Sequence, residues 1–110
     1  MKLLNIKFNG NGSESQIKWA SNIFNAEIKK VADKFETAKL RVADKSMPQS
    51  WVDSWVSVLN NVKAIAAVER FAGQSASDTI DFKGFKSKSG ASIAAILESL
   101  VNKQYKSSIN

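Results

Sequence analysis

The stretch KGFKSKSG, residues 83–90, is the part of the chain whose residue types point most directly to a chemical role. Lys83, Lys86 and Lys88 alternate with Phe85 and with small residues that would let a backbone approach a phosphate. Because ammonium groups contact phosphates and aromatic rings stack on bases, this pattern predicts contact with nucleic acid or with an acidic protein surface. The spacing of a phosphate-binding P-loop is missing, which argues against nucleotide hydrolysis. The alternative is a basic loop that binds nothing.

A second group of basic residues lies closer to the N-terminus, in a segment that is expected to be helical. At about 100° per residue, Lys30, Lys34 and Arg41 project on one side of this helix, beside its apolar stripe. A one-sided basic row of this kind could follow a phosphate backbone. The alternative is a solvated flank whose long aliphatic stems cover the edge of the core.

The residue types that remain offer little for catalysis. The chain contains no cysteine and no histidine, which excludes disulfides, zinc-finger sites and the nucleophile–base pairs built on these residues. Asp78 and Asp81 are close in sequence, but two carboxylates without further ligands make a weak cation site. No nucleophile–base pair is found among the serines, lysines and acids. The sequence therefore predicts a protein that is not an enzyme and uses no metal or cofactor.

Size, charge and hydropathy limit the remaining classes. At 110 residues, with 44% hydrophobic and 24% charged side chains, the chain is typical of one globular domain covering residues 1–110. Its formal net charge of +6 favours nucleic acid or an acidic protein as a partner. No apolar run approaches the roughly 20 residues of a membrane span, and the N-terminus is too polar for a signal peptide. We therefore expect a cytoplasmic protein with no membrane partner.

The basic row requires a long first helix, whose start is marked by a capping-box pattern of Ser13 and Gln16. Over residues 17–42, apolar side chains recur at intervals of three and four and keep one stripe in register. We expect a helix from residue 13 or 14 onwards, with a bend or break near Asp33 or Thr37 because a straight helix of this length would exceed a small domain. A coiled-coil dimer formed through this stripe is the alternative.

Trp19 lies within this helix but away from its apolar stripe. Because its ring carries a large apolar surface, we expect either the N-terminal segment or the last helix to cover it. The alternative is an exposed residue that contacts a partner.

A second helix is expected over residues 48–72, with Pro48 in its first turn and Gly73 ending it. Its apolar residues cover about half of the circumference, which is more than one helix contact requires. The helix is therefore either enclosed by the core or leaves part of this face free for a partner, including a second copy of the chain. Trp51 and Trp55 lie one turn apart on this face and are expected in the core, unless exposure makes them contact residues.

Two short segments, residues 2–8 and 79–83, show the alternation of apolar and polar side chains that is typical of strands. Pairing the two segments would satisfy their backbone hydrogen bonds, and a helix face would have to cover them. A last helix should follow from Ser89 or Gly90. The predicted fold is a helix-dominated α+β domain: a strand, two long helices, a short strand and a C-terminal helix, with a small two-stranded sheet.

At the start of the first helix the chain reads GSESQIKWASNI. This resembles the G-S-x-x-Q-I-x-W-A-x-x-I motif of small proteins from bacteriophages and other mobile elements. The segment containing Ala76, Ile80, Asp81 and Lys83 is similar to a second pattern of these proteins, which ends in Ile-Asp-x-Arg. The resemblance implies a mobile-element origin, and small phage proteins of this size often bind host defence machinery, as anti-CRISPR proteins do.

Two hypotheses about function follow. The first is a non-enzymatic phage or mobile-element accessory protein that binds and inhibits a host nuclease or ribonucleoprotein complex in the bacterial cytoplasm. Since a mimic of DNA would be acidic, such an inhibitor would have to bind guide RNA, an acidic protein surface or a subunit interface. The second is a small basic protein that binds DNA or RNA, and either protein would be a monomer or a homodimer. The candidate binding residues are Lys83, Phe85, Lys86, Lys88, Lys30, Lys34, Arg41 and Trp19.

Overall fold

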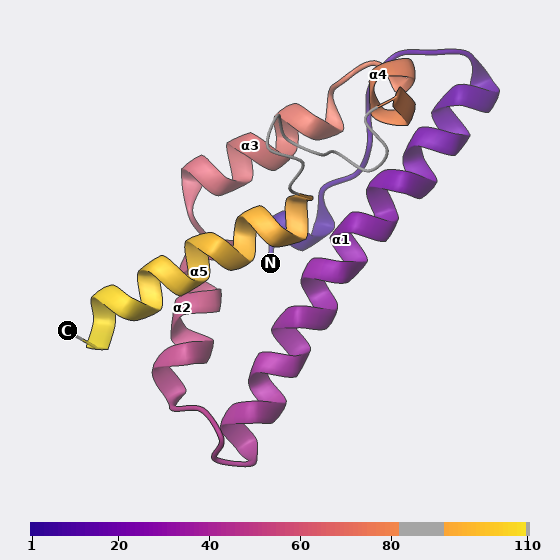
Figure 1. The fold of residues 1–110 in the computed structure, drawn as a ribbon. Helices are drawn as coiled ribbons and strands as arrows, with labels where there is room; N and C mark the ends of the chain where they lie inside the picture. Colours follow the sequence, from indigo (N-terminus) through magenta and orange to yellow (C-terminus); the bar gives the residue numbers. More distant parts are fainter. Residues whose placement is uncertain (82–91, 110) are drawn as a thin grey trace.

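The computed structural model describes residues 1–81 and 92–109, and every regular element within them is helical. The prediction of an α+β fold with a two-stranded sheet is therefore wrong. Figure 1 shows α1 along one side of an elongated molecule, with α2 and α3 returning along the other side and α5 crossing near them. The elements are η1 (Leu3–Asn5), α1 (Glu14–Ala43), α2 (Gln49–Leu59), α3 (Val62–Ala72), α4 (Ala76–Asp81) and α5 (Ile93–Ile109).

Helix α1 begins where its capping box predicts. The Ser13 Oγ accepts a hydrogen bond from the Gln16 N–H at 3.3 Å, and the Gln16 Oε1 accepts one from the Ser13 N–H at 3.0 Å. The helix then continues without the predicted break for 30 residues and ends at Ala43, before Lys45 turns the chain with a φ of 67°. Such a helix spans about 45 Å, which the molecule accommodates because its longest dimension is 47 Å.

The predicted second helix is two helices, because the chain breaks at Asn60 and Asn61. The Asn61 side chain accepts a hydrogen bond from the Ala64 N–H at 3.1 Å and so caps α3. Asparagine competes for backbone hydrogen bonds within a helix and is favoured as a cap, which explains the break. The broad apolar face that was predicted for one helix is thereby divided between α2 and α3, and each buries an ordinary stripe of its own.

The alternating segment at residues 2–8 is not a strand. Its burial does alternate, with Leu4, Ile6 and Phe8 half-buried, but the segment forms a 3-10 turn and then an extended stretch that lies on helices. The backbone of the following residues bonds to helix ends: the Asn9 N–H donates to the Ala72 carbonyl at 2.8 Å. Only glycine fits at Gly10, where a Cβ would lie 1.6 Å from the Gln74 carbonyl oxygen. The alternation of apolar and polar residues therefore arises because one side of this segment is buried against helices, and it does not require a partner strand.

The second predicted strand, residues 79–83, is also wrong where the structure describes it. Thr79 and Asp81 belong to α4, whose start is capped by a hydrogen bond from the Asp78 N–H to the Ser75 Oγ at 3.2 Å. This local cap stabilises a helical turn, whereas a strand would need a distant partner. Helix α5 begins at Ile93 and is capped by Ser92, while the start predicted for it, at Ser89 or Gly90, lies outside the described residues.

The core lies where α1, α2 and α5 meet, and Leu3 of η1 is fully buried in it. Trp55 is 1% exposed and packs near Phe35, with 6.4 Å between the ring centroids. Trp51 is half-buried and contacts both Trp55 and Tyr105 edge to face. The predicted core position of Trp55 is confirmed, and Trp51 packs at the edge of the same cluster. None of the helices in the described part of the chain is long and apolar enough to cross a bilayer.

Candidate binding surfaces

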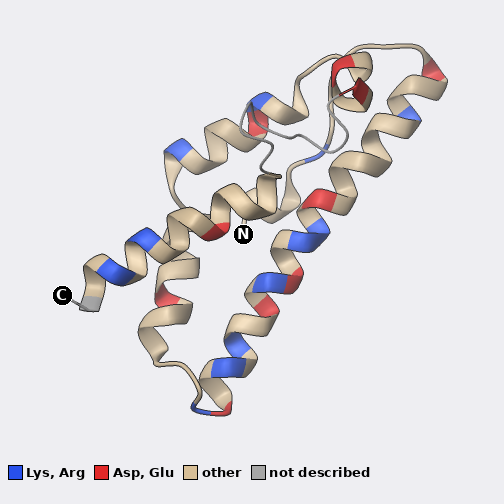
Figure 2. Ribbon diagram, in the orientation of Figure 1, with Lys and Arg blue, Asp and Glu red and all other residues tan. Residues whose placement is uncertain are grey.

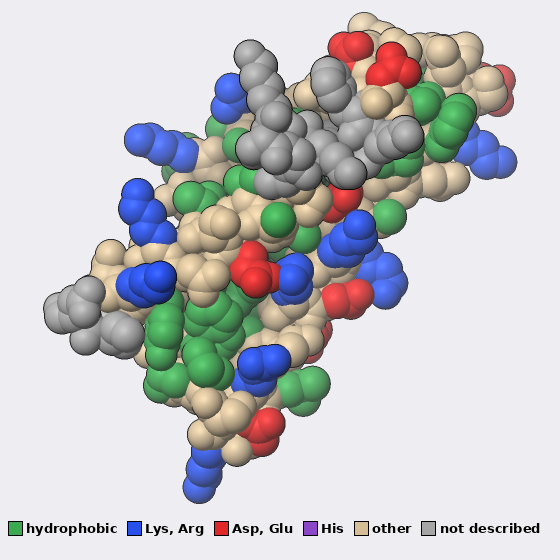
Figure 3. All heavy atoms as spheres, in the orientation of Figure 1, with side chains coloured by type: hydrophobic (Ala, Val, Ile, Leu, Met, Phe, Trp, Pro, Cys, Tyr) green, Lys and Arg blue, Asp and Glu red, His purple; other side chains and the backbone are tan. Residues whose placement is uncertain are grey.

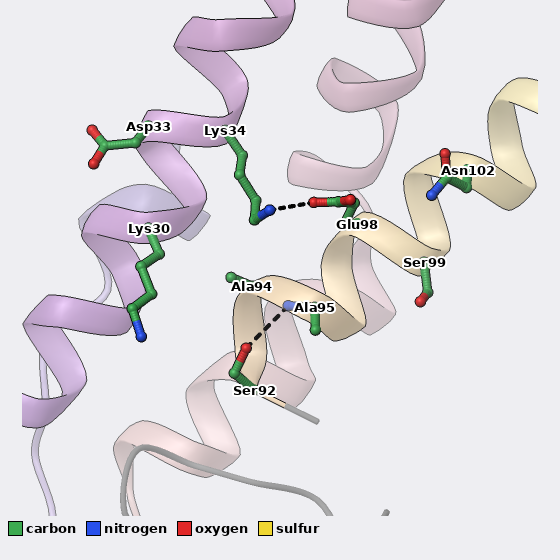
Figure 4. A pocket seen from close by; sticks show the side chains of 9 residues that line it. All are labelled: Lys30, Asp33, Lys34, Ser92, Ala94, Ala95, Glu98, Ser99 and Asn102. Carbon is green, nitrogen blue, oxygen red and sulfur yellow. Dashed lines mark hydrogen bonds and ion pairs between the residues drawn. The ribbon is translucent and has the colours of Figure 1, made fainter. Parts of the chain in front are cut away.

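The basic row predicted on the first helix lies along one side of α1, facing α5 and α2. Lys30 and Lys34 line a hollow of about 580 Å³ between α1 and α5, shown in Figure 4. Lys34 and Arg41 line an adjoining hollow of about 370 Å³ that reaches Trp51 of α2. The structure therefore brings these three candidates together on one face.

The charge of this face is largely balanced by acids. The Lys30 Nζ lies 3.5 Å from the Glu27 Oε1, and Lys34 forms an ion pair with Glu98 of α5, drawn as a dashed line in Figure 4. Figure 2 shows the same mixture of charges along α1, where Lys29 pairs with Asp33 and Lys39 with Glu36. A phosphate that approached Lys30 or Lys34 would therefore meet a cation whose charge a carboxylate already balances in part.

Arg41 forms no ion pair with any described acid. Hydrogen bonds from Ser46 lower the pKa of the Asp44 carboxyl at the end of α1, and the nearby Arg41 guanidinium adds to this effect. A single arginine beside an ionised aspartate does not make a row of phosphate contacts. The structure thus favours the interpretation of the α1 cations as a solvated, charge-balanced flank.

The hollow in Figure 4 contains serines, but their roles are structural. The Ser92 Oγ accepts a hydrogen bond from the Ala95 N–H at 3.2 Å and caps α5. Four of the described charged residues line this hollow: Lys34 and Glu98 pair with each other, Lys30 pairs with Glu27, and Asp33 pairs with Lys29. Among the described residues of this hollow, no serine is positioned against a base as a nucleophile would require.

Trp19 is exposed, contrary to the expectation that another element covers it. Its exposed fraction is 59%, and it lies with Ile23, Ala26 and Ile80 around a hollow of about 600 Å³ between α1 and α4. The expected cover fails because the N-terminal segment lies against the ends of α3 and α4 instead of forming a strand. Figure 3 shows hydrophobic side chains at the surface beside α4 in this part of the molecule. We call Trp19, Ile23, Ala26 and Ile80 the Trp19 surface.

A buried acid borders the Trp19 surface and was not predicted from the sequence. Glu27 lines the same hollow, is 4% exposed, and has one carboxylate oxygen, Oε2, without a hydrogen-bond partner. Its place at helical spacing within the apolar stripe of α1 is the signal that could have identified it. The other carboxylate oxygen, Oε1, lies 3.5 Å from the Lys30 Nζ, and Lys30 lines the same hollow. Buried polar atoms without partners are uncommon in folded proteins, although Trp55, Gln74 and Thr79 each have one too.

No family model, curated protein or solved structure matches this chain. Within the motif GSESQIKWASNI, Ser13 and Gln16 form the capping box and Ala20 is buried, so these positions have structural roles. Among the large apolar side chains of the motif, Trp19 is the most exposed, at 59%, and Ile17 follows at 36%.

Four candidates, Lys83, Phe85, Lys86 and Lys88, lie outside the described residues, and the structure places none of them. A further surface that was not predicted is a groove between α3 and α5. Lys63 and Lys103 line it, and none of the acidic residues that the structure describes does. The break at Asn61, which makes α3 a separate helix, is the sequence feature that could have indicated this groove.

Proposed function

We propose that this protein is a non-enzymatic binding protein that attaches to a partner protein through the Trp19 surface. The observation that carries the proposal is the 59% exposure of Trp19 beside a hollow that apolar side chains line together with Glu27, Lys30 and Asp81. Tryptophan is enriched among the residues that dominate binding energy, because its large ring loses much water-accessible area in a complex. A partner side chain inserted between α1 and α4 would cover Trp19 and Ile80 together.

The surroundings of Trp19 support a site that binding completes. Single exposed apolar residues are ordinary on protein surfaces. Here, however, a tryptophan, two isoleucines and an alanine border one hollow, and a buried carboxylate oxygen of Glu27 lies beside them without a partner. The exposed ring of Trp19 contributes little to the stability of the isolated chain, so its area is available to a partner.

The resemblance of GSESQIKWASNI to mobile-element proteins suggests the class of partner. Since its Ser13 and Gln16 cap α1, folding accounts for part of the motif, and Trp19 remains for contact. We therefore propose a host defence nuclease or ribonucleoprotein complex in the bacterial cytoplasm as the target, and inhibition by occlusion as the mechanism. The paired lysines of α1 make direct binding of nucleic acid the weaker alternative.

The test is a titration of the protein into purified RNA-guided nuclease complexes of several types, with DNA cleavage as the readout. We expect one complex to lose activity at a stoichiometric ratio and to gain the mass of the protein in native mass spectrometry. Binding to free DNA should be weak, which fluorescence anisotropy at low and high salt will show. If no nuclease responds and free DNA binds tightly with strong salt dependence, the nucleic-acid-binding alternative replaces the proposal.

A further inference from the structure

A groove lies between α3 and the C-terminal half of α5, on a different part of the molecule from the Trp19 surface. Helix α5 packs mainly against α2 and α1, and its weak contact with α3 leaves a hollow of about 370 Å³ between the two. The small residues Ala64 and Ala67 of α3 line it, together with Val58 of α2 and the 41%-exposed Leu100 of α5. These side chains form an apolar floor. We call this site the α3–α5 groove.

Cations border this groove on both sides, and no described acid balances them. Lys63 stands on one side and Lys103 on the other, while Arg70 lies two turns from Lys63 on the same face of α3. None of these three forms an ion pair with a described acid, and Glu69, the acid of α3, pairs with Lys2 at 3.5 Å. In Figure 3, blue side chains follow one another along the α3 and α5 side of this view. The groove therefore presents a positive border around an apolar floor.

This arrangement complements an amphipathic helix with acidic flanks. A helix that lies in a groove inserts one row of apolar side chains and directs its flanking residues to the two borders. Ala64 and Ala67 have small side chains, which permit a close approach of the incoming backbone. Glutamates or aspartates on its flanks would meet Lys63 and Lys103, which pair with none of the acids in residues 1–81 and 92–109.

No aromatic ring is among the described residues that line the groove. Single-stranded nucleic acid is held by stacking of its bases on such rings, so the groove favours a peptide over a nucleic acid. We propose that the α3–α5 groove binds an acidic amphipathic helix of a partner protein. The groove shares no residue with the Trp19 surface, so an experiment can contradict one proposal without affecting the other.

The experiment uses the full-length protein and a fluorescent synthetic helix of about 18 residues, with leucines on one face and glutamates on both flanks. Anisotropy measures its affinity, and backbone amide NMR shifts locate it. We expect binding with shifts confined to α3 and α5, and no binding of the same peptide with lysine in place of glutamate. Single-stranded DNA and an all-glutamate peptide serve as anionic probes without an apolar face and should bind at least about tenfold more weakly.

Two variants and a matched control test the residues. Lys63→Glu combined with Lys103→Glu should weaken peptide binding by about tenfold or more. Lys18→Glu combined with Lys45→Glu is the matched control, because it changes the net charge equally at exposed positions away from the groove. It should change the affinity for the peptide by less than about twofold. Ala67→Phe fills the floor of the groove without a charge change and should also weaken binding.

The proposal would be overturned if the peptide did not bind, if the two charge variants lost affinity equally, or if the NMR shifts mapped to α1. DNA binding as tight as that of the peptide, or binding unaffected by Ala67→Phe, would overturn it as well. Dimerisation of the protein through this groove would assign it to a second copy of the chain instead.

Discussion

Trp55 and Trp19 have the same side chain and opposite surroundings. Trp55 is 1% exposed in the core beneath α1 and α5, whereas Trp19 is 59% exposed near the start of α1. Trp51 lies between these extremes, half-buried against Trp55 and Tyr105. Folding buries the ring of Trp55, whereas the ring of Trp19 remains accessible to a partner. Substituting each of the three tryptophans by alanine measures how much its burial contributes to the free energy of unfolding.

The largest effect on stability is expected for Trp55→Ala. Removing this ring leaves a cavity among Phe35 and the other core residues, which should lower the free energy of unfolding by about 3–5 kcal/mol. Urea denaturation followed by circular dichroism measures the change. Trp55→Phe should cost less, because the Trp55 Nε1 has no hydrogen-bond partner to lose. A loss below about 1 kcal/mol for Trp55→Ala would contradict the core assignment.

An intermediate effect is expected for Trp51→Ala. The ring is only half-buried, but it contacts Trp55 and Tyr105 edge to face, with centroid distances of 6.4 and 5.2 Å. Losing this area and these contacts should lower the free energy of unfolding by about 1–2 kcal/mol. The same urea titration provides the value, and a result equal to that of Trp55→Ala would mean that the two rings unfold as one unit.

The smallest effect on stability is expected for Trp19→Ala. The substitution removes an exposed ring, so the free energy of unfolding should change by no more than about 0.5 kcal/mol. A variant that keeps Trp19 and has phenylalanine at positions 51 and 55 isolates its fluorescence. We expect emission typical of a solvated indole and strong quenching by iodide. Blue-shifted emission that resists iodide would show that another part of the chain covers this ring.

The cations of the molecule give a second comparison. Lys30 and Lys34 on α1 are balanced by Glu27 and Glu98, whereas Lys63 and Lys103 around the α3–α5 groove face no described acid. Helical projection correctly placed the α1 residues on one side. The Lys34–Glu98 pair joins residues far apart in sequence, so only the folded arrangement of α1 and α5 reveals that this row is balanced.

Local signals in the sequence were sufficient for parts of the fold. Ser13 and Gln16 predicted the start of α1, and Gly73 correctly marked the end of the helix that finishes at Ala72. Both depend on hydrogen bonds or backbone conformation within a few residues. The cap at Asn61 is equally local, but the apolar periodicity on both sides of it suggested one continuous helix.

The strands were mispredicted because side-chain alternation has more than one cause. In residues 2–8 it arises from a 3-10 turn and a following extended stretch that lie on helices with one side buried. At Thr79 and Asp81 the cap at Ser75 favours a helical turn. The sequence also placed Trp19 away from the stripe of α1. Whether another element covers it depends on the path of the N-terminal segment, which helical periodicity does not determine.

The most direct test of the central claim is the affinity of Trp19→Ala for the nuclease complex that the titration identifies. Leu40→Ala is the matched control, because Leu40 is 67% exposed on the same helix and lies outside the Trp19 surface. Isothermal titration calorimetry should show a loss of about 2 kcal/mol or more in binding free energy for Trp19→Ala. The loss for Leu40→Ala should stay below about 0.5 kcal/mol. Equal affinities of the two variants would contradict the proposed role of the Trp19 surface.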